Sequence, residues 1–319
     1  MSSLPKAKIL FLSVVLIFVA IIAVIKGPVN LHLSELFSAE NQQILHLRLA
    51  RVILAIISAC GLAVSGIILQ AILRNPLAEP YLLGTSSGAG LAAVGAVVLG
   101  VSTLYIPVSA FFGAVLSTFI VYSLSRKSGR LGIESLILSG VIVSIAFSAI
   151  IVFLLSTSNK EAMHGITWWL WGSLEVFDYK LLFVMSAIVI LGMFTASLFS
   201  RELNAISLGE EEALHLGINV EWFKKILLFL VALITAAIIS VCGIIGFVGL
   251  IIPHMGRLIV GPNHKILIPV SCLVAAVFMV SCDIISRTLF LPSEVPIGVV
   301  TAIIGTPVFI ILLRKSEAD

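Results

Sequence analysis

Charged residues are scarce in this sequence. Asp, Glu, Lys and Arg together make up 11% of the 319 residues, whereas a soluble domain carries about a quarter. Hydrophobic residues make up 60%, and they come in runs long enough for helices of about 20 residues to cross the roughly 30 Å of membrane hydrocarbon. The alternation of polar and apolar residues that is typical of a membrane β-barrel is missing. The sequence therefore predicts an all-α polytopic membrane protein.

Patterns that are typical of metal and redox sites are also missing. The four cysteines lie in apolar runs without metal-ligand or redox spacing, so we expect them to be core residues. The six histidines form no H-x-x-x-H or H-E-x-x-H pattern, which argues against an intramembrane metalloenzyme. We therefore predict no catalytic residue and no metal site, and scattered basic residues give no reason to expect nucleic acid binding. The cysteines are Cys60, Cys242, Cys272 and Cys282.

Ten apolar segments predict ten transmembrane helices, which form a single domain over residues 1–319. The first segment follows Lys6 and Lys8 as a signal peptide would, but it lacks a clear small-x-small cleavage site. We interpret it as a retained first helix. The expected spans are 9–26, 50–73, 82–101, 105–125, 134–156, 179–200, 224–242, 247–260, 266–289 and 296–314.

The even number of spans places both termini on one side of the membrane. If that side is the cytoplasm, inner loops and tails hold twelve Lys and Arg residues against six in outer loops, with Arg257 unassigned. This distribution follows the positive-inside rule. Trp168, Trp169 and Trp171 then fall in an outer loop, where we interpret them as an anchor at the level of the lipid headgroups.

The longest polar interruption is the segment 201–225, RELNAISLGEEEALHLGINVEWFKK, which we call the platform. It is too polar to cross a bilayer and too short to form a domain. Its pattern predicts two short amphipathic helices hinged at Gly209 and Gly217, with Glu210, Glu211 and Glu212 between them. A cytoplasmic platform of this kind indicates a docking site for another protein.

Two prolines interrupt the helical pattern in residues 74–80, RNPLAEP. Pro76 and Pro80 each remove a backbone donor and disfavour helix at the preceding residue. The segment is either a plain re-entrant turn or part of a gate. The small-residue runs 84–90 and 60–66 beside it either allow close helix packing or line a path for a solute.

Basic and acidic residues gather near the predicted outer face. Asp283 and Arg287 are four residues apart on one helix, so they can form an ion pair. Arg48 and Arg51 share a face at the outer start of the second span. With Arg287 they would place positive charge around an outer opening, which suits an acidic docking partner or an anionic solute. A structural ion pair and a functional site are both open for Asp283 and Arg287.

Several long motifs resemble one family, the iron-chelate and vitamin B12 class of ABC-importer permeases. The resemblance covers the chain after the first span, in the same order as in the family. The motifs are RLARVILAIISACGLAVSGIILQAILRNPLAEPYLLGTSSGAGLAAV (48–94), LGEEEALHLGINV (208–220), GIIGFVGLIIPHMGRLIVGPNHKILIPVS (243–271) and EVPIGVVTAIIGTPVFIILLRK (294–315).

This resemblance implies a type II ABC importer permease fold and a homodimer in the cytoplasmic (inner) membrane of a bacterium or archaeon. It implies two cytoplasmic ATPase subunits, which bind ATP and Mg, and an extracytoplasmic substrate-binding protein. The chain itself has no G-x-x-x-x-G-K-[ST] phosphate loop, and no cofactor is expected in it. The implied sites are Leu208, Gly209, Glu210, Glu211, Ala213 and Gly217 for ATPase coupling, Arg48, Arg51 and Arg287 for docking of the binding protein, and Asn75, Pro76, Leu77, Glu134, Ser139 and Gly140 for the gate and pathway.

An ion-coupled secondary transporter is the alternative function. It predicts an acidic residue near the middle of the membrane, whereas Asp283 and Glu294 fall near an outer boundary. The solute is open among a ferric siderophore, haem and cobalamin, with the siderophore as the first expectation. Met163 and His164 could contact haem iron, but a lone pair of this kind is more typical of an ordinary loop.

Overall fold

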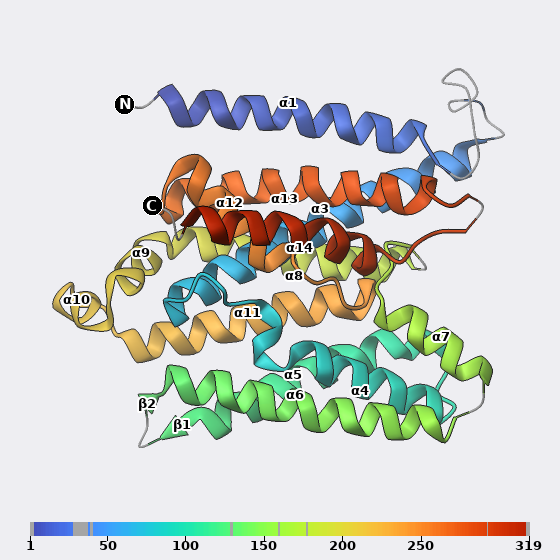
Figure 1. The fold of residues 1–319 in the computed structure, drawn as a ribbon, viewed down its shortest axis with the longest axis horizontal. Coiled ribbons are helices and arrows are strands. Elements are labelled where there is room, and N and C mark those ends of the chain that lie inside the picture. The colour runs from blue at the N-terminus through green and yellow to red at the C-terminus, as the bar shows by residue number, and fades with distance from the viewer. Residues whose placement is uncertain are drawn as a thin grey trace.

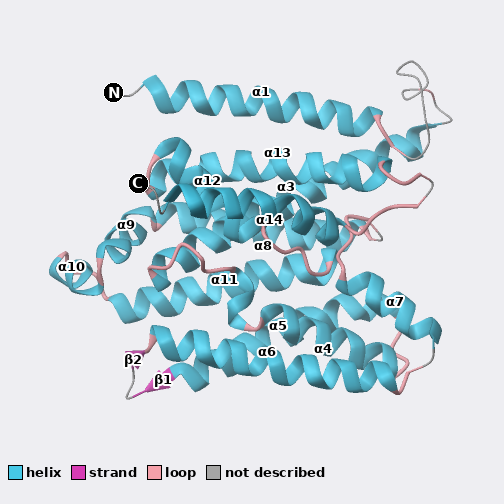
Figure 2. Ribbon diagram, viewed as in Figure 1, coloured by secondary structure: helices cyan, strands magenta, loops and turns pink. Residues whose placement is uncertain are grey.

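Helices make up nearly all of the computed structural model, which describes residues 3–27, 38, 41–127, 130–158, 160–176, 178–291 and 293–316. One short hairpin, β1 (Arg126–Lys127) with β2 (Arg130–Leu131), joins two of the helices (Figure 2). The helices are α1 (Ser3–Ile25), α3 (Gln42–Leu73), η2 (Pro80–Leu83), α4 (Thr85–Val98), η3 (Thr103–Tyr105), α5 (Ile106–Ser125), α6 (Ile133–Ser156), α7 (Lys160–Leu170), α8 (Tyr179–Leu198), α9 (Ser200–Leu208), α10 (Glu210–His215), α11 (Val220–Cys242), α12 (Val248–Val260), α13 (His264–Thr288) and α14 (Ile297–Ser316).

Each of the ten predicted spans coincides with a helix. Seven helices within the described residues are long and apolar enough to cross a membrane. The helices α4, α12 and the described apolar part of α14 are shorter, so the predicted count of ten crossings is not confirmed. The all-α prediction is confirmed for the described residues.

The long helices lie roughly side by side, with α1 at one edge and α4, α5 and α6 at the other (Figure 1). Both ends of the chain lie at the same end of the bundle as α9, α10 and the β hairpin, and α7 lies at the opposite end. We call these the platform end and the α7 end. This arrangement agrees with an even number of crossings.

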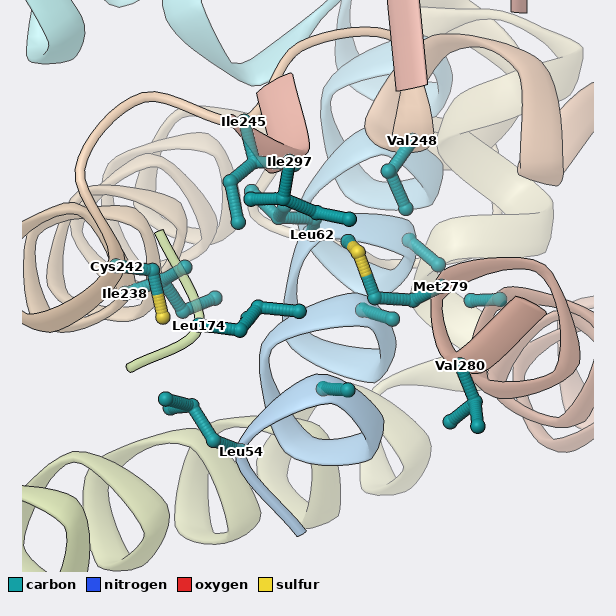
Figure 3. Close-up of a cluster of buried hydrophobic side chains, with 14 of the residues drawn as sticks. Leu54, Leu62, Leu174, Ile238, Cys242, Ile245, Val248, Met279, Val280 and Ile297 are labelled. Atoms are coloured by element: carbon teal, nitrogen blue, oxygen red, sulfur yellow. The ribbon is translucent and has the colours of Figure 1, made fainter. Parts of the chain in front are cut away.

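The core surrounds α3. Of the most apolar 18-residue stretch in this helix, 83% is buried, whereas the corresponding stretch of α1 is only 6% buried. Leu54 and Leu62 of α3 meet Ile238 of α11 and Met279 of α13 in one apolar cluster (Figure 3). Because a hydrocarbon environment provides no hydrophobic drive between helices, such contacts stabilise the bundle through close packing.

Glycines allow the closest helix contacts. A Cβ atom at Gly66 would overlap the carbonyl oxygen of Gly249, and one at Gly88 would overlap Ser117 and lie close to Gly113. These glycines bring α3 against α12 and α4 against α5. Both small-residue runs therefore serve helix packing, the first of the two roles left open by the sequence; their place along a solute path stays a prediction.

The segment predicted as an outer loop with three tryptophans is partly helical, and its role as a membrane anchor stays a prediction. Trp168 and Trp169 belong to α7, and only Trp171 follows its end. The segment's amphipathic pattern lets one helical face pack on α4, which the sequence interpretation did not consider. The side chains of Met163 and His164 lie outside the described residues.

Candidate functional site

The platform forms two short helices, as predicted. α9 ends at Leu208, Gly209 connects it to α10, and Gly217 has a φ of +77°. That left-handed conformation favours glycine because it has no Cβ, and it turns the chain toward α11. Ala213 is fully buried, whereas Leu208, Leu214 and Leu216 are 74%, 59% and 69% exposed. The platform therefore presents apolar side chains, with the acidic first turn of α10, at one end of the bundle.

Side chains fasten this platform to the bundle. The side-chain oxygen of Asn204 in α9 accepts a hydrogen bond from the backbone N–H of His264 at 2.9 Å, at the start of α13. Lys224 of α11 is buried and forms an ion pair with Glu210, with 2.6 Å between Nζ and Oε1. The sequence interpretation missed this contact of Lys224, because it counted this lysine only among the basic residues of the inner loops.

The chain break predicted at residues 74–80 is confirmed. Arg74 ends α3 in the left-handed conformation, with a φ of 47°. The backbone N–H of Leu77 donates to Asn75 Oδ1 at 2.8 Å, and Pro76 and Leu77 are exposed. η2 and then α4 follow. The tip is therefore an exposed turn, and its role as a gate stays a prediction.

Behind this tip, the segment 78–84 contacts the non-helical segment 243–247, far away in the sequence. The hydroxyl of Tyr81 donates to the carbonyl of Ile245 at 2.9 Å and accepts from its N–H at 3.2 Å. Glu79 Oε1 accepts from the N–H of Phe247 at 3.1 Å, which starts α12. Burial raises the pKa of the Glu79 carboxyl, while the hydrogen bond from Phe247 opposes this change.

Gln70 extends the same network into α3. Its Oε1 accepts from Arg257 Nη1 at 2.6 Å, and its Nε2 donates to the carbonyls of Ala78 and Leu250, each at 3.2 Å. Non-helical backbone inside a membrane protein needs such partners because lipid offers none. The sequence interpretation did not identify Glu79 or Gln70. The position of Glu79 between Pro76 and Pro80 is a pattern that could have indicated a polar contact there.

At the α7 end, Asp283 is shared by two guanidinium groups. The predicted pair with Arg287 is confirmed, with 3.0 Å between Oδ2 and Nη2. Arg51 Nε lies 2.7 Å from Asp283 Oδ1, and its Nη2 lies 2.8 Å from Glu294 Oε2. The helices α3 and α13 and the non-helical segment before α14 therefore meet at one charge network.

Arg48 and Arg287 hold the end of α1 through its backbone. Arg48 Nη1 donates to the carbonyls of Val24 and Ile25 at 2.9 and 2.8 Å. Arg287 donates to the carbonyls of Ala23 and Lys26 at 3.0 and 3.1 Å. Cationic groups are stabilising at a helix C-terminus because its carbonyls lack partners within the helix.

The positive charge expected around an outer opening is largely compensated within the chain. Arg48 and Arg287 are only 6% and 2% exposed, and Arg51 is already paired with two carboxylates. The reason is that Asp283, Glu294 and the α1 carbonyls satisfy these groups within the chain. Docking of a partner at these arginines stays a prediction.

Of the predicted pathway residues on α6, Gly140 packs against the 74–84 segment. A Cβ atom there would overlap the carbonyl oxygen of Leu82. Glu134 is exposed in the first turn of α6, and Ser139 is partly buried. The exposed apolar face of α6 includes Leu138, Ile142 and Ile145. Any role of Glu134 and Ser139 in a pathway stays a prediction.

The cysteines are free thiols in apolar surroundings. Cys60, Cys242 and Cys282 are buried, and Cys272 is partly buried, which confirms their prediction as core residues. Among the described residues, no group of three His, Cys, Asp or Glu side chains could hold a metal ion.

Known proteins resemble this chain over nearly its full length. The cobalamin import system permease protein BtuC of Halobacterium salinarum is 39% identical over 85% of this chain and 73% of its own length. The hemin transport system permease protein HmuU of Yersinia pestis is 35% identical over 98% of this chain and 97% of its own. A solved structure of a metal-chelate type ABC transporter, in an inward-facing conformation, has a TM-score of 0.88 and 33% identity. That match covers 97% of this chain and 99% of the solved one.

The family comparison agrees with these relatives. The FecCD transport family matches residues 15–315, which includes every helix from α3 to α13, the second part of α1 and nearly all of α14. The chain therefore belongs to the FecCD transport family.

Proposed function

We propose that this chain is the membrane-spanning permease subunit of an ATP-binding-cassette importer that carries a metal chelate across the cytoplasmic membrane. The observation that carries this proposal is the family match over residues 15–315, together with relatives that are permease proteins of import systems. The permease performs no covalent chemistry in this proposal and acts with a second copy of itself.

Partner ATPases supply the energy by contact. The platform supports this step, because Leu208, Leu214 and Leu216 are exposed there beside the acidic residues Glu211 and Glu212. We assign it as the docking surface for two cytoplasmic ATPase subunits. Rigid-body motion of the platform then rearranges the helices around the central pathway. Both termini lie in the cytoplasm in this orientation.

A binding protein delivers the solute at the α7 end. Docking at Arg51 requires an acidic group of the binding protein to compete with Glu294, which is 24% exposed. The variant Arg51→Lys keeps the charge and removes the two-pronged geometry of the guanidinium. We expect weaker binding of the cognate binding protein by the purified permease, with normal elution in gel filtration. Unchanged affinity would remove Arg51 from the docking role.

A ferric siderophore is the first candidate solute, with haem and cobalamin as further candidates. Relatives of similar identity are named for cobalamin, hemin, iron chelatin and molybdate, so overall identity does not select one. The ligand that co-purifies with the cognate binding protein decides between them.

Reconstitution in lipid vesicles tests the function. With cognate ATPase and binding protein, we expect solute uptake that depends on ATP hydrolysis and continues after ion gradients are dissipated with ionophores. The competing function is ion-coupled secondary transport. Uptake by the isolated chain from an ion gradient alone would overturn our proposal.

The exposed turn at Asn75, Pro76 and Leu77 is the proposed inner gate. Single cysteines at these positions, in a background without native cysteines, should react with a maleimide at rates that change when ATP is trapped in the ATPases. Rates that are independent of nucleotide would identify a plain turn.

A further inference from the structure

The position of α10 is weakly fixed by its own backbone. This helix is six residues long and lies between Gly209 and Gly217, and glycine allows more backbone freedom than any other residue. Force from a docked partner would rotate α10 about these glycines unless other contacts fix its position. The packing of Ala213 is one such contact, since this residue is fully buried.

Lys224 provides a second, charged contact. Its side chain is 1% exposed, and its Nζ lies 2.6 Å from Glu210 Oε1 in α10 and 3.7 Å from Glu221 Oε1 in α11. A buried ammonium group is tolerated only where charged or polar partners compensate its lost hydration. Lys225, the next residue, is exposed, so the burial is specific to one of two adjacent lysines.

Glu221 continues the contact to a third element. Its Oε2 accepts from the backbone N–H of Leu131 at 3.2 Å, in the hairpin that joins α5 to α6. The polar path therefore runs from Glu210 through Lys224 and Glu221 to Leu131. It links the consecutive helices α10 and α11 to a hairpin whose Leu131 lies 90 positions before Glu221.

Apolar packing joins the same three elements. Leu131, Ala213, Val220 and Leu227 belong to one cluster of buried hydrophobic residues. The Lys224 side chain is shielded from water, whereas the side chains of Glu210 and Glu221 are 36% and 42% exposed. The ion pairs and the apolar packing together therefore oppose relative movement of α10, α11 and the hairpin.

We propose that Lys224 is a positioning residue of the transport cycle. Its ion pairs lock α10 to α11 and, through Glu221, to the α5–α6 hairpin. Displacement of the platform is then passed to α11 and to the α5–α6 pair together. This inference rests on the proposed function, in which an ATPase docks at the platform; Glu210 acts inside the permease rather than on the ATPase.

The test compares Lys224→Met with Lys265→Met, a change at an exposed lysine of α13 outside the platform, in vesicles that contain the complete importer. Met removes the charge and keeps most of the side-chain volume. For Lys224→Met we expect the ATPase to remain bound, while solute transported per ATP falls roughly fivefold or more, the lower part of the range for coupled sites. Lys265→Met should leave this ratio unchanged, and Lys224→Arg should restore most of it because the cation is kept.

An unchanged ratio of solute to ATP in Lys224→Met would overturn the proposal. If Lys224→Met does not assemble, Glu221→Gln replaces it, since this change weakens only the link to Lys224 and the hairpin; a lowered ratio supports the proposal. Loss of assembly in both variants would mean that the charges maintain the fold rather than transmit motion, which also overturns it. Failure of the proposed function is distinct: the wild-type importer would then show no ATP-driven uptake.

Discussion

Asp283 has no exposed surface, and it faces the guanidinium groups of Arg51 and Arg287. Spacing within one helix predicted the pair with Arg287. The contact with Arg51 joins residues 232 positions apart, so no local pattern indicated it. For the same reason, the sequence overestimated the exposed positive charge at the α7 end.

Removing this carboxylate charge should be costly. Asp283→Asn leaves two buried guanidinium groups with less compensation, and we expect a loss of about 3–5 kcal/mol in the free energy of unfolding. Denaturant unfolding in detergent micelles, followed by tryptophan fluorescence, measures it. Glu294→Gln is the control: this side chain is 24% exposed, so we expect a loss of about 1 kcal/mol or less. Equal losses in both variants would contradict the assigned burial of the charge.

At the scale of elements, hydropathy predicted where the helices lie, but capping determines where several begin. α11 starts at Val220, four residues before the predicted span, because Asn219 Oδ1 accepts from the N–H of Trp222 at 3.1 Å. Likewise, α13 starts at His264 with a cap from Asn263. Hydropathy is averaged over several residues and does not register such polar caps. It therefore predicts the start of each helix a few residues too late.

The close approach of α3 and α12 depends on Gly66. Gly66→Ala places a methyl group on the carbonyl oxygen of Gly249, and we expect a loss of about 1–3 kcal/mol in unfolding free energy from overpacking. The matched control is Gly95→Ala in α4, where a Cβ atom meets nothing within 4 Å; there, alanine should be neutral or stabilising by up to about 1 kcal/mol. Similar melting temperatures for the two variants would argue against the contact.

Glu79 fixes the start of α12 against the segment before α4. Glu79→Ala leaves the N–H of Phe247 without its acceptor, and a loss of about 1 kcal/mol is typical for a removed helix cap. Glu79→Gln keeps an acceptor oxygen, so its melting temperature in detergent should stay close to that of the wild type. If the two variants melt together below the wild type, the charge rather than the hydrogen bond is the important property.

For the whole molecule, the even number of apolar runs predicted that both termini share one end with the platform, and Figure 1 shows this arrangement. The contacts that assemble the bundle were not predictable from one sequence. Tyr81 and Ile245 are 164 positions apart, and their hydrogen bonds depend on two non-helical segments meeting. Periodicity describes one helix at a time, so it carries no information on such meetings.

Orientation in the membrane is testable with two exposed positions. Glu175→Cys lies near the α7 end and Glu211→Cys lies on the platform. In intact cells, or in spheroplasts where an outer membrane is present, we expect a membrane-impermeant maleimide to label only the Glu175 variant. The Glu211 variant should react after permeabilisation, and unsubstituted protein reports the background from native cysteines. The reverse result would invert the topology.

Arg48 and Arg287 hold α1 through hydrogen bonds to main-chain carbonyls, which every amino acid possesses. Lys26 therefore contributes its main-chain carbonyl to this contact, independently of its side chain. Lys26, whose own side chain is exposed, becomes a convenient attachment point for a fluorophore. A reporter placed there would sense movement of the first helix while leaving its anchorage chemically intact.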